Sequence, residues 1–168
     1  MTGPRVVLVG PMGAGKSTVA RILAEQWGIG FRDTDDDVEA VDGRAISDIF
    51  VESGEEYFRA LERDAVSRAL AEHDGVLAVG GGAVMDATTR TALAGHRVVY
   101  LRVGLADAAS RVGLGTSRPL LLGNVRGRLI QLLNQRTPLY AEVATVTVAT
   151  DDRTADEVVL VVVAGLPT

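Results

Sequence analysis

A lysine and a serine end a glycine-rich segment in the arrangement that binds nucleotide phosphates. Residues 10–17 read G-P-M-G-A-G-K-S, which matches the pattern G-x-x-x-x-G-K-[ST]. Glycines let the backbone turn so that successive N–H groups face one point, and the start of a following helix adds further free N–H groups. Lys16 is expected to reach the β and γ phosphates and the Ser17 hydroxyl to ligate Mg²⁺. The predicted nucleotide-binding residues are Gly13, Ala14, Gly15, Lys16, Ser17 and Thr18.

Acidic residues follow the second apolar run of the chain, where residues 33–37 read D-T-D-D-D. The carboxyl ends of parallel strands are where ligands bind in an open α/β sheet. Asp36 and Asp37 are typical of the first turn of a helix. Asp33 and Asp35 stand two residues apart and can serve two different ligands, so we expect functional roles for both.

Two further groups could contact a substrate. Arg59 and Glu62 are spaced i, i+3 and share a helix face, an arrangement that by spacing alone is more often a solvated surface pair. Gly80, Gly81 and Gly82 follow a predicted strand. Three consecutive glycines carry a conformational cost that a plain turn does not need, so close approach of their N–H groups to a ligand is the better explanation.

Composition restricts the class of protein. The 168 residues contain no cysteine and carry a net charge of −5, which argues against thiolate chemistry and against attraction to nucleic acid or an anionic membrane. No signal peptide is recognisable, and the most apolar segment, 158–166, is shorter than a membrane span. We therefore expect a cytoplasmic protein whose anionic substrates are held by local arginines.

The elements that must position these residues alternate between strands and helices. Strands are expected over 6–9, 29–32, 76–79, 98–101 and 145–149. Helices are expected over 17–27, 46–72 with a break at 53–54, 86–95, 105–111 and 128–135. The valine-rich tail could be a strand, but Thr154 and Glu157 form a capping-box pattern that favours a closing helix.

This alternation predicts one α/β domain over 1–168, with a parallel sheet covered on both faces. Residues 112–127 lose all periodicity and are flanked by glycines. An irregular segment of this length within a compact domain is usually a functional lid.

Taken together, these motifs resemble the shikimate kinase family over nearly the whole chain. The resemblance rests on 10–17, D-T-D at 33–35, G-R-A-I at 43–46, I-F at 49–50, F-R-x-x-E at 58–62, G-G-G at 80–82, R-P-L-L at 118–121 and R-T-P-L-Y at 136–140. It implies a three-layer α/β/α P-loop kinase fold with sheet order 2-3-1-4-5. It also implies transfer of the γ-phosphate of ATP to the 3-hydroxyl of shikimate, on the route to chorismate and the aromatic amino acids.

The resemblance also implies roles for single residues. Lys16 and Arg118 neutralise charge on the phosphates, and Asp35 takes the proton of the attacking hydroxyl. Ser17, and Asp33 through water, hold Mg²⁺. Arg111 is expected to stack on adenine. Arg59 and Arg136 are expected to bind the shikimate carboxylate, with Glu62 orienting Arg59. The backbone of Gly80, Gly81 and Gly82 is expected to hold the ring hydroxyls. Shikimate is expected to bind in a helical region over 34–62. The protein is expected to be a monomer that binds ATP and shikimate and neither nucleic acid nor a membrane.

The chain departs from the family pattern at 149–153, A-T-D-D-R, which lacks the proline expected near adenine. No acidic residue ends the third or fourth predicted strand, so Asp33 must replace the usual magnesium aspartate. Another metabolite kinase, such as a gluconate kinase, stays open as an alternative, but it should lack the paired arginines around a D-T-D motif. A GTP-dependent switch needs N-K-x-D and D-x-x-G motifs, and neither occurs.

Overall fold

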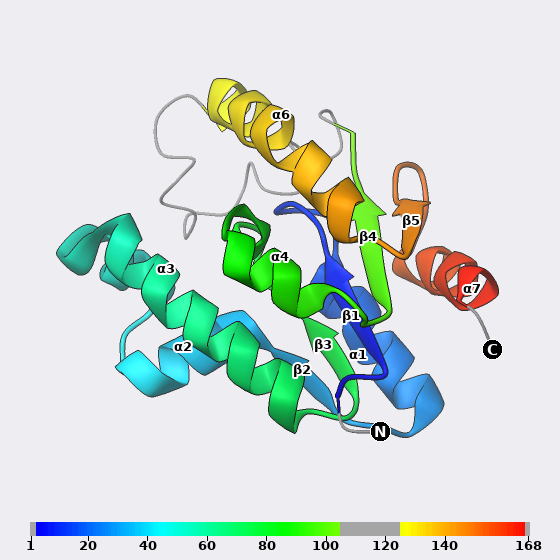
Figure 1. The fold of residues 1–168 in the computed structure, drawn as a ribbon. Coiled ribbons are helices and arrows are strands. Elements are labelled where there is room, and N and C mark those ends of the chain that lie inside the picture. Colours follow the sequence, from blue (N-terminus) through cyan, green and yellow to red (C-terminus); the bar gives the residue numbers. More distant parts are fainter. Residues whose placement is uncertain (1–2, 105–124, 167–168) are drawn as a thin grey trace.

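Five parallel strands form one sheet in the order β2-β3-β1-β4-β5. The structure is a computed structural model that describes residues 3–104 and 125–166. The strands are β1 (Val6–Val9), β2 (Phe31–Asp33), β3 (Val76–Ala78), β4 (Val98–Arg102) and β5 (Val146–Ala149). The order implied by the resemblance is confirmed, and β1 lies at the centre, so the loop that follows it opens at the middle of the sheet (Figure 1).

The central strand shows why both faces of the sheet must be covered. All four residues of β1 are buried, although side chains alternate between the two faces of a strand. Val6 and Leu8 pack into one apolar core, while Val7 and Val9 pack into another. A strand that is apolar on both faces requires helices on both, which explains the continuous apolar run in the sequence.

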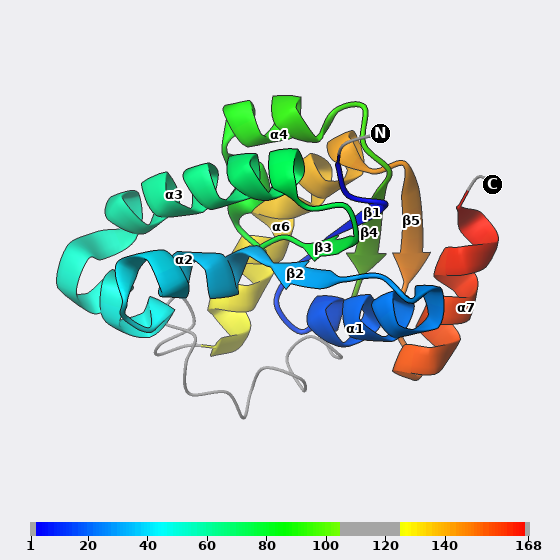
Figure 2. The same ribbon diagram turned by 90° about the horizontal axis from the view of Figure 1, so that it is seen from below.

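Helices form a layer on each side of the sheet (Figures 1 and 2). One core contains side chains from α1 (Lys16–Trp27) and α7 (Ala155–Gly165). The opposite core contains side chains from α3 (Ile46–Glu72), the single turn η1 (Ala83–Met85), α4 (Ala87–Leu93) and α6 (Val125–Val143). The predicted three-layer fold is therefore confirmed.

A smaller third core joins α2 (Thr34–Asp42) to α3 beyond the edge of the sheet. It contains Val38, Ile49, Phe58 and Ala65. Gly54 has non-helical dihedral angles, φ 87° and ψ 169°, so the long helix is broken at the position predicted from Ser53-Gly54. The break separates the segment carrying Ile49 from the one carrying Phe58, and these two side chains meet in the same core.

Some predicted boundaries were wrong. The second strand begins at Phe31 instead of residue 29, because the backbone N–H of Ile29 still donates to Ala24 in the cap of α1. The helix predicted over 128–135 instead spans 125–143 and continues through Pro138. Proline removes one backbone donor, but the turn beyond it carries the fully buried Tyr140, whose packing holds the helix together.

The lid prediction is affected at one end. Residues 125–127 of the segment expected to be irregular belong to α6, while 112–124 and the helix expected over 105–111 lie outside the described residues. In the part of the chain that is described, no helix is long and apolar enough to cross a bilayer.

The closing helix α7 begins with the predicted capping box. The Thr154 side chain accepts a hydrogen bond from the Glu157 N–H at 3.2 Å, and the Glu157 carboxylate accepts one from the Thr154 N–H at 3.1 Å. Both bonds satisfy N–H groups that a helix start leaves without partners. The valine-rich tail is therefore helical, as the capping pattern predicted.

Replacing Thr154 by alanine should lower the free energy of unfolding by about 1 kcal/mol, because one N–H of the first turn loses its acceptor. Thr88→Ala is the matched control, since Thr88 is an exposed threonine in the first turn of α4. Urea unfolding followed by circular dichroism measures both. Equal stability of Thr154→Ala and the unsubstituted protein would contradict this account of the cap.

Candidate active site

The loop between β1 and α1 adopts the backbone that its glycines predicted. Gly10, Gly13 and Gly15 have φ values of 153°, 81° and 84°, in the region that side chains other than glycine rarely adopt. A Cβ on Gly10 would also lie 2.6 Å from the carbonyl oxygen of Leu101. The loop therefore needs glycine for both backbone conformation and space, and it leads directly into the N-terminus of α1.

Two side chains at the start of α1 face the loop and the neighbouring strand. The Lys16 Nζ donates to the carbonyl oxygens of Gly10 and Pro11, at 2.7 Å and 3.2 Å. The Ser17 hydroxyl donates to a carboxylate oxygen of Asp33 at 2.7 Å, across the gap from α1 to the end of β2. Asp33 also accepts the N–H of Asp35 and thereby caps α2, so one carboxylate orients both elements.

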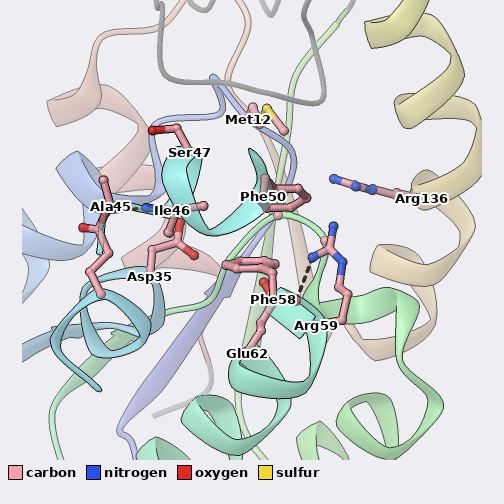
Figure 3. A pocket seen from close by; sticks show the side chains of 13 residues that line it. Met12, Asp35, Ala45, Ile46, Ser47, Phe50, Phe58, Arg59, Glu62 and Arg136 are labelled. Carbon is pink, nitrogen blue, oxygen red and sulfur yellow. Dashed lines mark hydrogen bonds and ion pairs between the residues drawn. The ribbon is translucent and has the colours of Figure 1, made fainter. Parts of the chain in front are cut away.

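A cavity of about 250 Å³ lies next to this loop (Figure 3). It is lined by apolar and charged groups that are far apart in sequence, including Met12, Asp35, Phe50, Phe58, Arg59, Glu62 and Arg136. The Phe50 and Phe58 rings form one wall, with their centroids 4.7 Å apart. Such a mixture of ring surface and converging polar groups is typical of a small-molecule site.

Arg59 and Glu62 both line this cavity. Their spacing alone favoured a solvated surface pair, and that interpretation is wrong. Glu62 is only 4% exposed and accepts a hydrogen bond from the Arg59 Nη1 at 2.7 Å. Burial raises the pKa of the Glu62 carboxyl, while the positive charge of Arg59 opposes that shift. Side-chain direction and helix packing placed this pair inside, and neither is visible in an i, i+3 spacing.

A second arginine reaches the same cavity from α6 (Figure 3). Arg136 is 3% exposed, and within the described part of the chain its Nε has no hydrogen-bond partner. Burial lowers the pKa of its guanidinium. Because a buried guanidinium is stabilised by an anionic partner, the cavity is suited to a ligand that carries a carboxylate or phosphate.

The glycine segment 80–82 packs closely against charged side chains of the cavity. None of Gly80, Gly81 and Gly82 has a positive φ. A Cβ on Gly80 would lie 2.7 Å from carboxylate oxygens of both Asp35 and Glu62, and a Cβ on Gly82 would overlap the Arg59 guanidinium. Gly80 and Gly82 therefore make room for charged side chains, and the approach of the glycine N–H groups to a ligand stays a prediction.

Comparisons with known proteins agree with this geometry. The family model described as shikimate kinase matches residues 12–166. A curated shikimate kinase of Frankia casuarinae is 61% identical over 161 residues, which cover 96% of this chain and 72% of that protein. The chain belongs to the shikimate kinase family.

Solved structures place the fold in the same family. A shikimate kinase from Acinetobacter baumannii in complex with shikimate has a TM-score of 0.92 and 38% identity, covering 97% of this chain and 92% of that chain. A gluconokinase from Sinorhizobium meliloti has a TM-score of 0.62 at 20% identity, covering 98% and 91%. The second likeness shows the fold alone, and the family evidence favours shikimate kinase over the gluconate kinase alternative.

A second cavity of about 220 Å³ lies on the other side of the phosphate-binding loop. Its lining includes Ala14, Gly15, Thr18, Thr150 and Arg153. Arg153 donates to the carbonyl oxygen of Ala149 at 2.7 Å, which orders the segment that departs from the shikimate kinase pattern. The expected nucleotide contacts Arg111 and Arg118 lie outside the described residues.

Sequence reasoning missed two hydroxyl groups that hold the glycine segment. The buried Thr34 hydroxyl accepts the N–H of Gly80 at 3.1 Å, and the buried Tyr140 hydroxyl donates to the carbonyl oxygen of Gly81. Both residues stand inside motifs on which the sequence resemblance rests, D-T-D and R-T-P-L-Y, but only tertiary structure brings them to the glycines.

Substituting Thr34 by valine should lower the free energy of unfolding by about 1–3 kcal/mol, because the buried N–H of Gly80 loses its acceptor while the side-chain volume is kept. Amide hydrogen exchange at Gly80 should accelerate, whereas exchange at Leu8 in β1 should follow the global stability. Unchanged protection at Gly80 would show that the Thr34 hydroxyl does not hold this segment.

Proposed function

We propose that this chain transfers the γ-phosphoryl group of ATP to the 3-hydroxyl of shikimate, giving shikimate 3-phosphate and ADP. The observation that carries the proposal is the cavity that joins Asp35, Arg59 and Arg136 beside a phosphate-binding loop. Shikimate is a small ring with one carboxylate and several hydroxyls. A site with two guanidinium groups, the carboxylate of Asp35 and a glycine segment offers a partner for each of these groups.

The two arginines are the proposed partners of the shikimate carboxylate. Arg59 comes from α3 and is oriented by the buried Glu62, and Arg136 comes from α6. Planar guanidinium groups bind a carboxylate with two parallel hydrogen bonds, which set the orientation of the shikimate ring and also contribute binding energy. Gly81 and Gly82, which line the cavity, are the proposed backbone contacts to the ring hydroxyls. Gly80 supports them, since its own N–H donates to Thr34.

Asp35 is the proposed general base. It lines the cavity as the second residue of α2, two positions after the last residue of β2. During transfer the 3-oxygen forms a bond to the γ-phosphorus, the bond between that phosphorus and the β,γ-bridging oxygen breaks, and the hydroxyl proton passes to Asp35. Lys16 is proposed to leave the Gly10 and Pro11 carbonyls for the phosphate oxygens.

The pair Ser17 and Asp33 fits a magnesium ion. Their hydroxyl and carboxylate oxygens lie 2.7 Å apart at the mouth of the loop, and hard oxygen ligands are those that Mg²⁺ prefers. In the described residues no cluster of three or more acidic or histidine side chains could hold a metal, which suits an ion bound mainly by phosphates and water. When bound, Mg²⁺ supplies charge neutralisation for the β and γ phosphates.

The nucleotide is proposed to span the loop between the two cavities. Gly13, Ala14, Gly15, Lys16, Ser17 and Thr18 would hold its phosphates, with the base toward the cavity that contains Thr150 and Arg153. The resemblance to the family assigns Arg111 to adenine and Arg118 to the phosphates. We further propose that residues 1–168 act as one domain and as a monomer in the cytoplasm, with shikimate received by the region 34–62 and covered by the segment 112–127.

The substrate assignment predicts which compounds release ADP. The purified protein with Mg²⁺ and ATP should form ADP with shikimate and at least about 10²-fold more slowly with gluconate or nucleoside monophosphates, because these lack a ring carboxylate placed between two guanidinium groups. A coupled ADP assay over this panel measures the rates. Equal turnover of gluconate would replace shikimate kinase by the alternative metabolite kinase.

The roles of the base and the carboxylate clamp separate by kinetics and binding. Asp35→Asn should lower kcat by at least about 10²-fold while shikimate still binds, because a general base acts in the transition state. Arg136→Leu should instead lose shikimate binding. Calorimetry with shikimate distinguishes the two variants.

Controls for these variants come from neighbouring residues. Asp36→Asn changes an exposed carboxylate one position away, and Arg128→Leu changes an exposed arginine on α6. Both controls should bind and turn over shikimate normally. If Asp35→Asn lost binding but kept its chemistry, the two roles would be assigned the wrong way round.

A further inference from the structure

Tyr140 is a buried residue of the R-T-P-L-Y motif for which the proposed reaction supplies no role. Its side chain is fully buried in the last turns of α6, and its ring stacks on that of Tyr100 with centroids 5.0 Å apart. Its hydroxyl donates a 2.5 Å hydrogen bond to the carbonyl oxygen of Gly81. The hydroxyl therefore links α6 to the glycine segment, 59 residues away in the sequence.

The same hydroxyl faces the buried arginine of the carboxylate clamp. Arg136 stands one helical turn before Tyr140 on α6, and its Nη1 lies 3.8 Å from the place a Cβ on Gly81 would take, beside the carbonyl that Tyr140 contacts. A phenol has one proton to donate, and that proton is directed to Gly81. Toward Arg136 the oxygen can only accept, so its lone pairs face the guanidinium while its proton stays with Gly81.

The apolar surroundings of the Tyr140 hydroxyl make its polar neighbours informative. The ring packs among apolar side chains of the core that includes Val7, Val9 and Leu93, where phenylalanine would fill the same space. Placing a hydroxyl there is unfavourable unless it meets polar partners. Burial raises the pKa of Tyr140 to about 12, so the phenol keeps its proton and remains a donor to Gly81 near neutral pH.

We propose that Tyr140 is a positioning residue for the substrate carboxylate, because its hydroxyl fixes the Arg136 guanidinium relative to Gly81. The inference rests on the proposed function, since it concerns the same site. A guanidinium that has few protein acceptors is free to rotate about its long side chain, and the Tyr140 oxygen removes that freedom before substrate arrives. Substrates that carry a carboxylate should gain from this, and substrates without one should not.

Comparing shikimate with its uncharged methyl ester tests this role. The ratio of kcat/KM for shikimate to kcat/KM for the ester measures how well the enzyme recognises the carboxylate. Tyr140→Phe should reduce this ratio about tenfold, mainly through a higher KM for shikimate, because the guanidinium loses the polar oxygen beside it. Tyr100→Phe is the matched control: it removes the hydroxyl of the stacked ring, which Thr137 and not Gly81 contacts, and should leave the ratio unchanged.

The outcomes separate positioning from a purely structural contribution. If Tyr140→Phe lowers kcat/KM equally for shikimate and the ester, the hydroxyl only supports the fold and the proposal is overturned. Unchanged kinetics with both substrates would overturn it as well. If the unsubstituted protein does not phosphorylate shikimate at all, the proposed function fails first, and that result is distinguishable from either outcome for Tyr140.

A measurement on the unsubstituted protein covers the case in which Tyr140→Phe does not fold. The chain has three tyrosines, so ¹³C labelling at the tyrosine Cζ gives three signals. Tyr57→Phe and Tyr100→Phe assign two of them and leave Tyr140 as the third. The Tyr140 signal should shift when shikimate is added and shift less with the methyl ester; equal shifts, or none, would contradict the proposal.

Discussion

Burial of positive charge without full compensation by the protein is the constraint on which this site depends. Arg136 is almost completely removed from water, and its Nε has no partner among the described residues. Arg59 is nearby but is held by the buried Glu62. The carboxylates of Glu62 and Glu55 both pair with Arg59, which leaves the Arg136 guanidinium suited to an anion. The proposed function assigns that place to the carboxylate of the ligand.

The glycine segment is the packing solution that allows this arrangement. Asp35, Glu62 and Arg59 all approach the backbone at Gly80 and Gly82 so closely that no Cβ fits. Hydroxyls from two sides, Thr34 and Tyr140, hold the backbone groups of Gly80 and Gly81. Neighbouring side chains thus order this segment, since glycine itself has little conformational preference. Three consecutive glycines can therefore keep one conformation in the site.

The parallel sheet connects this substrate cavity to the nucleotide loop. The loop after β1, the acidic residues after β2 and the glycines after β3 all stand at the carboxyl ends of adjacent strands. Ser17 and Asp33 make the connection directly, because their hydrogen bond joins the start of α1 to the end of β2. Phosphoryl transfer requires two substrates to be held in line, and neighbouring strand ends place their binding groups within reach of each other.

What the sequence alone determined is local or periodic. The phosphate-binding loop, the break at Gly54 and the capping box at Thr154 each lie within a few adjacent residues, and the five strands follow from apolar runs. Tertiary structure alone decided that Arg59 and Glu62 face inward, that α6 continues through Pro138, and that Thr34 and Tyr140 hold the glycines. These features depend on contacts between residues some 46 and 59 positions apart and on which helix face is buried, and neither is encoded in the spacing of neighbouring residues.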